Sequence, residues 1–183
     1  MARIPYADPA RIHPKARAVL ESLPPGNIFR IIAHAETVLD PFNRMGGALL
    51  RRGTLDPRLR ELAILRVGHL AKARYEIAQH EAIGRDVGLS EAEIAGLARG
   101  ADDPAFGPRE KAVLRFADDV AVNVRAGEPI FAAVAEFLDH RQMVELTLCV
   151  GFYMMVSRLL ETFDVELEDK QLLTGFKSGQ VGR

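Results

Sequence analysis

The stretch ELAILRVGHL, residues 61–70, decides the fold, because as a helix it is apolar nearly all the way round. A helix of this kind must be packed on several sides, so we expect it at the centre of a helical bundle. Glu61 and Arg66 are the exceptions on its surface. A bare carboxylate in a protein core is very costly, so Glu61 needs hydrogen-bond or charge partners, or must keep its proton. The sequence therefore predicts a partner for Glu61 on the next helix.

That partner is expected from residues 74–87. Glu76 and His80 are four residues apart and share a helical face with two core hydrophobes, so both polar groups point inward. A short turn separates this helix from residues 57–71, which predicts an antiparallel hairpin. Glu61 then reaches His80, and two carboxylates fix the tautomer of the imidazole and raise its pKa. The sequence predicts a proton-handling Glu–His–Glu cluster.

The same residues allow two other interpretations. Glu76 and His80 also match a satisfied polar pair on a half-buried helix, with no chemical role. Together with Glu61 they offer a possible metal-ligand triad, although zinc prefers more nitrogen or sulfur ligands. Tyr153 and Arg158 interrupt another apolar stretch, and Arg158 is a candidate for binding a substrate carboxylate. The structural alternative for Arg158 is an ion pair with Glu61 or Glu145.

Helix-capping residues punctuate the rest of the chain. Asp40-Pro41 and Asp56-Pro57 each place a capping side chain before a proline, and Ser90 begins a capping box. Glycines stand where helix C-caps are expected, at Gly53, Gly88, Gly100 and Gly127. No strand alternation competes, so we predict an all-α compact bundle of about eight helices. The expected helices are 27–39, 41–52, 57–71, 74–87, 91–99, 108–126, 129–138 and 140–162.

Prolines divide the chain into two parts. Five of the ten fall before residue 26, which predicts an irregular N-terminal arm over 1–25, with a possible short helix near 15–22. Residues 26–183 are then expected to form a single helical domain, and 48% hydrophobic residues suffice for its core.

Composition excludes several classes of protein. A net charge of -1, with scattered basic residues, lacks the electrostatic footprint of a nucleic-acid binder. The N-terminus has no secretory signal, so we expect a cytoplasmic protein. The most apolar stretch, 146–157, is too short to cross a bilayer and is interpreted as a buried core helix, without a membrane partner. The single cysteine, Cys149, can form no intrachain disulfide.

Three motifs carry a family resemblance. LDPRLRELAILRV (55–67), YEIAQH (75–80) and GLSEAEI (88–94), in this order and spacing, resemble the carboxymuconolactone decarboxylase family, whose other branch is the alkylhydroperoxidase D-like proteins. The family core would span about 50–125. The resemblance implies an all-α fold and assembly into homo-oligomers, whether dimers, trimers or hexamers.

The peroxidase branch of that family uses a Cys-x-x-Cys motif, whose second cysteine lies four residues before the histidine. Ala73 and Glu76 occupy those two positions here. A dithiol must attack, form a mixed disulfide and resolve it, and neither side chain can do so. A peroxidase-type activity is therefore a weaker hypothesis than the two given below.

The decarboxylase branch fits the residues better. Loss of carbon dioxide from a lactone acid needs a dry pocket, a stabilised oxyanion and a proton for carbon, and it requires no cofactor. The resemblance implies that His80 donates the proton or binds the oxyanion, Glu61 orients His80, and Glu76 tunes its charge or shuttles protons. Arg66, Tyr153 and Arg158 would bind the substrate.

Two functional hypotheses follow from this resemblance. The first is a cofactor-independent lyase or proton-transfer enzyme that acts on a small organic acid or lactone. The second is a non-enzymatic, oligomeric or small-ligand-binding module on the same scaffold. Gln79 replaces the first histidine of the family's His-His pair, so the namesake substrate is not assumed.

Overall fold

Helices alone build the part of the chain that the structure, a computed structural model, describes: residues 1–168 contain nine α-helices and no strand. The all-α prediction is therefore confirmed. The helices are α1 (Pro14–Ser22), α2 (Asn27–Ile32), α3 (Glu36–Arg51), α4 (Pro57–Ala71), α5 (Arg74–Asp86), α6 (Glu91–Gly96), α7 (Pro108–Asn123), α8 (Glu128–Ala135) and α9 (His140–Thr162).

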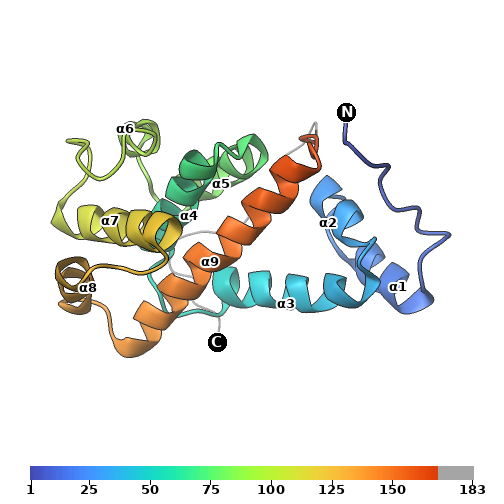
Figure 1. Cartoon of the computed structure of the whole chain (residues 1–183), viewed down its shortest axis with the longest axis horizontal. Coiled ribbons are helices and arrows are strands. Elements are labelled where there is room, and N and C mark those ends of the chain that lie inside the picture. Colours follow the sequence, from blue (N-terminus) through green and yellow to red (C-terminus); the bar gives the residue numbers. More distant parts are fainter. Residues whose placement is uncertain (169–183) are drawn as a thin grey trace.

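Helix α4 lies at the centre of the fold, as its all-round apolar surface predicts. It packs against α5, α7 and α9, and Leu62, Ala63 and Ile64 are completely buried. Helix α9 crosses the molecule diagonally, with α4 to α8 on one side and α1 to α3 on the other (Figure 1). The core is therefore built where α4 and α9 meet.

Helix α9 has the bounds expected from the sequence, residues 140–162. The apolar stretch of residues 146–157 belongs to a helix of 23 residues, which is long and apolar enough to cross a membrane by length and composition. The prediction considered only the twelve apolar residues, whereas the whole helix, with polar residues at both ends, passes this test of length and composition. Half of its most apolar window is nevertheless buried inside this fold, against α4, α7 and other helices, as in a core helix.

The hairpin of α4 and α5 is closed by a sharp turn. Lys72 adopts the left-handed conformation with φ 55° and ends α4, and α5 begins at Arg74. The two helices approach closely at Gly68, where a Cβ atom would lie 3.1 Å from Ile77. At the other end, the Asp56 carboxylate accepts two backbone N–H groups and caps α4, as predicted. These features fix which residues of α4 and α5 face each other.

The predicted boundary at Asp40-Pro41 was wrong. The chain breaks its helix at residues 33–35 instead, and Pro41 lies inside α3. Asp40 caps no helix; its carboxylate pairs with Arg44, one turn further along. Proline removes only one backbone hydrogen bond near the start of a long helix, so the burial of Leu39 outweighs that loss.

Two of the four predicted glycine caps lie elsewhere. Gly53 and Gly88 directly follow the C-cap residues of α3 and α5. Gly100 has a positive φ but lies in the turn beyond α6, which ends at Gly96, and Gly127 is the N-cap of α8. The left-handed residue after α7 is Val124, with φ 71°.

The N-terminal segment packs on the helical domain. Arg3 donates its backbone N–H to the Phe163 carbonyl just beyond α9, and Ala7 donates to the carbonyl of Arg30 in α2. Figure 1 shows this segment running beside α1 and α2, with its start near the end of α9. The short helix predicted near 15–22 is present as α1.

Candidate functional site

His80 lies between two carboxylates, one from each helix of the hairpin. Its Nδ1 is 2.6 Å from Oε2 of Glu61 on α4, and its Nε2 is 3.2 Å from Oε1 of Glu76 on α5. The relative exposures of Glu61, His80 and Glu76 are 0%, 2% and 4%. The predicted meeting of these three side chains is confirmed, and their role in catalysis stays a prediction.

Arg60 adds a fourth charge that sequence reasoning missed. Its Nε donates to Oε1 of Glu61 at 3.1 Å, so each oxygen of this carboxylate faces a different basic group. Arg60 is itself only 4% exposed. The sequence predicts a partner for Glu61 only on the next helix, not at the neighbouring position in α4. We call Arg60, Glu61, His80 and Glu76 the charge row.

Opposing electrostatic effects act on His80. Burial lowers the pKa of its imidazole, but the carboxylates of Glu61 and Glu76 outweigh burial and raise that pKa to about 9. The ring is therefore an imidazolium at neutral pH, and both of its N–H groups can donate to the flanking carboxylates. With both carboxylates ionised, the charge row alternates in sign and its net charge is zero.

Tyr153 of α9 packs against the imidazole. The two rings meet edge to face, with their centroids 4.8 Å apart. Burial, with the nearby carboxylates, raises the pKa of the Tyr153 phenol well above its ordinary value, so this hydroxyl stays protonated. Of the predicted substrate-binding residues, Tyr153 is the one that the fold brings to His80.

The charge row borders a small cavity. Glu76, His80 and Tyr153 line a space of about 200 Å³, together with side chains from α2, α3, α5 and α9. Most of the walls are apolar, and the remaining lining residues are Pro24, Ile28, Phe29, Phe42, Asn43, Gly46, Gly47, Leu50, Arg51, Tyr75, Gln79, Phe152 and Val156. A few converging polar groups in an apolar cavity are typical of small-molecule sites.

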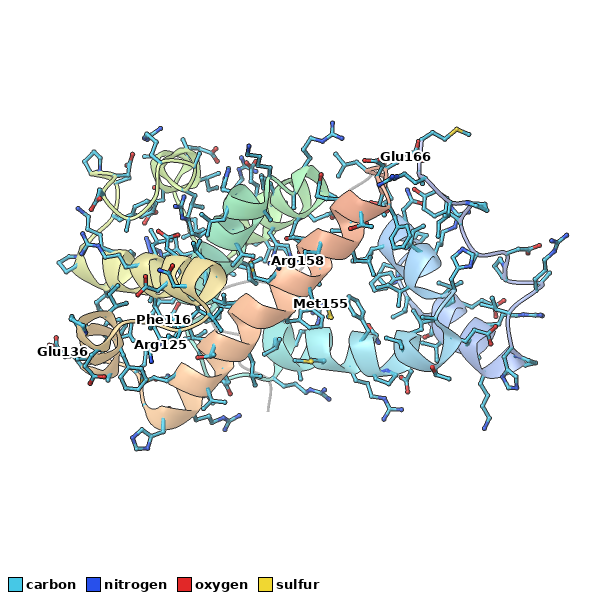
Figure 2. The ribbon with its side chains drawn as sticks, viewed as in Figure 1. Phe116, Arg125, Glu136, Met155, Arg158 and Glu166 are labelled. Atoms are coloured by element: carbon cyan, nitrogen blue, oxygen red, sulfur yellow. The ribbon has the colours of Figure 1, made fainter. Side chains whose placement is uncertain are left out.

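Two predicted substrate-binding arginines lie elsewhere. Arg66 pairs with Asp118 of α7 at 2.5 Å and donates to the Leu97 carbonyl at 2.8 Å. Arg158 is exposed on α9 (Figure 2), where it donates to the carbonyl of Met154. Neither lines the cavity, so neither is placed to bind a substrate carboxylate beside His80. An arginine's position on a helix, without the helix's orientation, did not reveal which neighbour it faces.

The structural alternative for Arg158 is not observed either. Glu145 accepts a hydrogen bond from Arg141 and others from the backbone N–H groups of Thr54 and Leu55, and Glu61 pairs with Arg60 and His80. These two carboxylates therefore have partners other than Arg158.

The metal alternative fits the donor set poorly. As an imidazolium, His80 carries a proton on each ring nitrogen and offers no nitrogen lone pair to a cation. Within residues 1–168, no group of three or more His, Cys, Asp or Glu side chains is arranged to hold a metal ion.

Comparisons with known proteins agree with this arrangement. The model of the carboxymuconolactone decarboxylase family matches residues 36–119, which include the whole hairpin. No curated protein matches the sequence significantly.

Solved structures share the fold at low sequence identity. The alkylhydroperoxidase AhpD core of a peroxidase-related protein from Ralstonia eutropha JMP134 superposes with a TM-score of 0.79 at 22% identity, over 97% of each chain. A peroxidase-related protein from Silicibacter sp. TM1040 gives 0.68 at 18% identity, over 83% of this chain and 79% of that one. A protein of unknown function from Agrobacterium tumefaciens superposes with a TM-score of 0.67 at 19% sequence identity, over 75% of this chain and 96% of that one.

The family match and the shared fold cover the same helices that carry Glu61, Glu76 and His80. Ala73 and Glu76 occupy the two positions at which the resemblance implies the cysteines of the redox branch. Residues 36–119 match the model of the carboxymuconolactone decarboxylase family, and the described part of the chain has the alkylhydroperoxidase D-like fold, with a single cysteine and hence no Cys-x-x-Cys pair.

Proposed function

We propose that this protein is a cofactor-independent lyase or proton-transfer enzyme that acts on a small organic acid or lactone. The observation that carries the proposal is a buried imidazolium, His80, held between two carboxylates at the wall of an apolar cavity. Buried groups with a strongly raised pKa beside a cavity are typical of sites that move protons.

Glu76 is the member of the charge row best placed to exchange a proton with a ligand. It lines the cavity, whereas both ring nitrogens of His80 already face carboxylates. A proton passes from His80 Nε2 to Glu76, and from Glu76 to the ligand. Glu61 and Arg60, behind the imidazole, hold its orientation and favour its charged form.

Decarboxylation fits this geometry as follows. The bond between the substrate's carboxyl carbon and the adjacent carbon breaks, carbon dioxide leaves, and the electron pair moves into a neighbouring carbonyl to form an enolate. Glu76, protonated through His80, then delivers a proton to that carbon, and solvent restores the proton to the pair. The Tyr153 hydroxyl, which stays protonated, is a candidate donor to the enolate oxygen.

A ligand-binding module without catalysis is the second candidate. It is favoured by the tight pairing of His80, because a fully satisfied polar cluster can also serve only to fix a core. The two candidates differ in turnover, since both require the same cavity.

A dithiol peroxidase mechanism within one subunit is not part of the proposal. Cys149 is the only cysteine of the chain, it is buried, and burial raises the pKa of its thiol. Peroxide consumption with a dithiol donor is expected to match a protein-free blank. Sustained cycling above that blank would contradict this view.

The test is a thermal-shift screen against small organic acids and lactones, followed by carbon dioxide release and product analysis on the hits. Glu76→Gln and His80→Ala are expected to lower turnover by about 100-fold or more, the range of a lost general acid–base group. Glu81→Gln on the same helix, whose carboxylate pairs with Arg85 instead, is the matched control and should retain activity. Turnover in His80→Ala equal to that of the wild type would defeat the catalytic assignment.

A further inference from the structure

The carboxylate of Glu168, which follows α9 in the chain, is bound beside the cavity by three neutral donors. The Tyr75 hydroxyl donates to its Oε1 at 2.8 Å, the Gln79 side-chain amide donates to its Oε2 at 3.3 Å, and the backbone N–H of Asn27 donates to Oε1. Tyr75 and Gln79 are 4% and 5% exposed. We call these three donors the cradle.

The α5 members of the cradle and of the charge row occupy neighbouring rows of that helix. Tyr75 and Gln79 are four residues apart on α5, and Glu76 and His80 form the next pair, one residue later. All four side chains line the cavity. A molecule held at the cradle therefore presents its next atoms toward Glu76.

Neutral donors make the cradle suitable for exchange between carboxylates. Glu61 and Asp118 face arginines, whereas the Glu168 carboxylate contacts an O–H, a side-chain amide and a backbone N–H. Such bonds hold an anion without the Coulomb attraction of a buried ion pair. A free carboxylate can form the same hydrogen bonds, and it also buries an apolar body in the cavity.

We propose that the cradle is the carboxylate subsite of this cavity, and that Glu168 is an intramolecular competitor that occupies it until a ligand arrives. This inference rests on the proposed function only for the location of the site. The ligand class it assigns is a carboxylate with a small, flat apolar body, whose carbon next to the anchored carboxylate lies toward Glu76. The anchored carboxylate stays on the ligand and proton transfer takes place beside it, so a decarboxylation at this site removes a second carboxyl group.

The experiment measures binding of benzoate to the full-length protein by calorimetry, with benzamide as the neutral analogue. Removing the competitor with Glu168→Ala should tighten benzoate binding by about tenfold or more, because the competent fraction of the site rises. Benzamide affinity should not change. The matched control is Glu166→Ala, which removes a carboxylate two residues away that instead contacts Tyr6 and the N-terminus.

Two further variants identify the donors. In the Glu168→Ala background, Tyr75→Phe and Gln79→Ala should each weaken benzoate binding by about tenfold, the usual cost of a lost hydrogen bond to a charged group. Circular dichroism melts establish that each variant is folded. If Glu168→Ala is unfolded, Glu168→Gln replaces it, since the amide keeps one acceptor but lacks the negative charge.

Several results would overturn the inference. One is equal benzoate affinity in wild type and Glu168→Ala, which would make Glu168 a structural anchor only. Another is an equal gain from Glu166→Ala, or an equal gain for benzamide, which would indicate general opening of the cavity. The binding assay needs no turnover, so it can be interpreted even if the protein proves not to be an enzyme. If benzoate binding does not depend on Glu168, the turnover test of His80 is unaffected.

Discussion

Nδ1 of His80 lies 2.6 Å from Oε2 of Glu61, across the α4–α5 hairpin, and both side chains are shielded from water. An ion pair at this distance is strong in a core, and it reverses the effect that burial alone has on the imidazole. The raised pKa of His80 is therefore a direct consequence of how two helices are registered.

The first prediction concerns stability against pH. The pKa of His80 rises from 6.5 to about 9 on folding, so its contribution is complete below about pH 6.5 and is lost as pH rises through 9. At 1.36 kcal/mol per unit, the contribution is about 3 kcal/mol. Urea unfolding of the wild type and His80→Gln from pH 6 to 10 measures it. Parallel stability curves for the two proteins would contradict the assignment.

The second prediction separates charge from packing in the charge row. Glu61→Gln leaves Arg60 without its carboxylate in the core and should cost about 3 kcal/mol of unfolding free energy. It should also lower the pKa of His80, followed by NMR. Adding Arg60→Met removes the stranded charge, so the double variant should regain most of the stability. No recovery in the double variant would mean that packing, rather than charge, sets the cost.

The third prediction uses Gly47, which lines the cavity inside α3. A Cβ atom there would meet nothing within 4 Å, so Gly47→Ala should raise stability by up to about 1 kcal/mol through helix propensity. The Gly47→Leu side chain extends further into the cavity and should abolish binding of the ligands found by thermal shift. The melting temperature of the ligand-free variant should stay close to that of the wild type. Met45→Leu, on an exposed position of the same helix, is the control. Undiminished binding by Gly47→Leu would place the ligand elsewhere.

The fourth prediction concerns assembly, which the family resemblance implies. Val144, Leu148 and Met155 are exposed on one face of α9, on which Gly151 also lies with no described atom near its Cβ position. Met155 is seen on this helix in Figure 2. We propose that a second copy of the chain covers this face. Leu148→Glu should then yield monomers in analytical ultracentrifugation, whereas Val122→Glu on α7 should not.

Gly151→Ala tests independently whether another chain covers this face of α9. In a helix that faces only solvent, the change raises stability by about 1 kcal/mol and leaves the sedimentation of the protein unchanged. If another helix approaches at this glycine, the added methyl group weakens association instead. A wild-type protein that sediments as a monomer at all concentrations would end the proposal.

Much of the site could be predicted because it is local in sequence. The apolar helix around Glu61, the short turn and the four-residue spacing of Glu76 and His80 together fix a hairpin whose polar groups must meet. Asp56 and Ser90 acted as caps because capping depends on neighbours within one turn.

What could not be predicted depends on distant packing. Glu168 reaches Tyr75 across 93 positions of sequence, and no pattern near either residue indicates the contact. Arg66 faces α7 because the orientation of α4 in the bundle turns it there. The helix break at residues 33–35 likewise follows tertiary packing, which outweighs the local signal of Pro41.

The short turn at Lys72 has a wider consequence. It confines Glu61, Glu76 and His80 to a single supersecondary unit, while α2, α3 and α9 shape the space in front of them. Apart from Tyr153 of α9, which packs on His80, cavity residues of those three outer helices can thus change and alter which molecule fits without touching Glu61, Glu76 or His80. Chemistry and selectivity are free to diverge separately among proteins that inherit this hairpin.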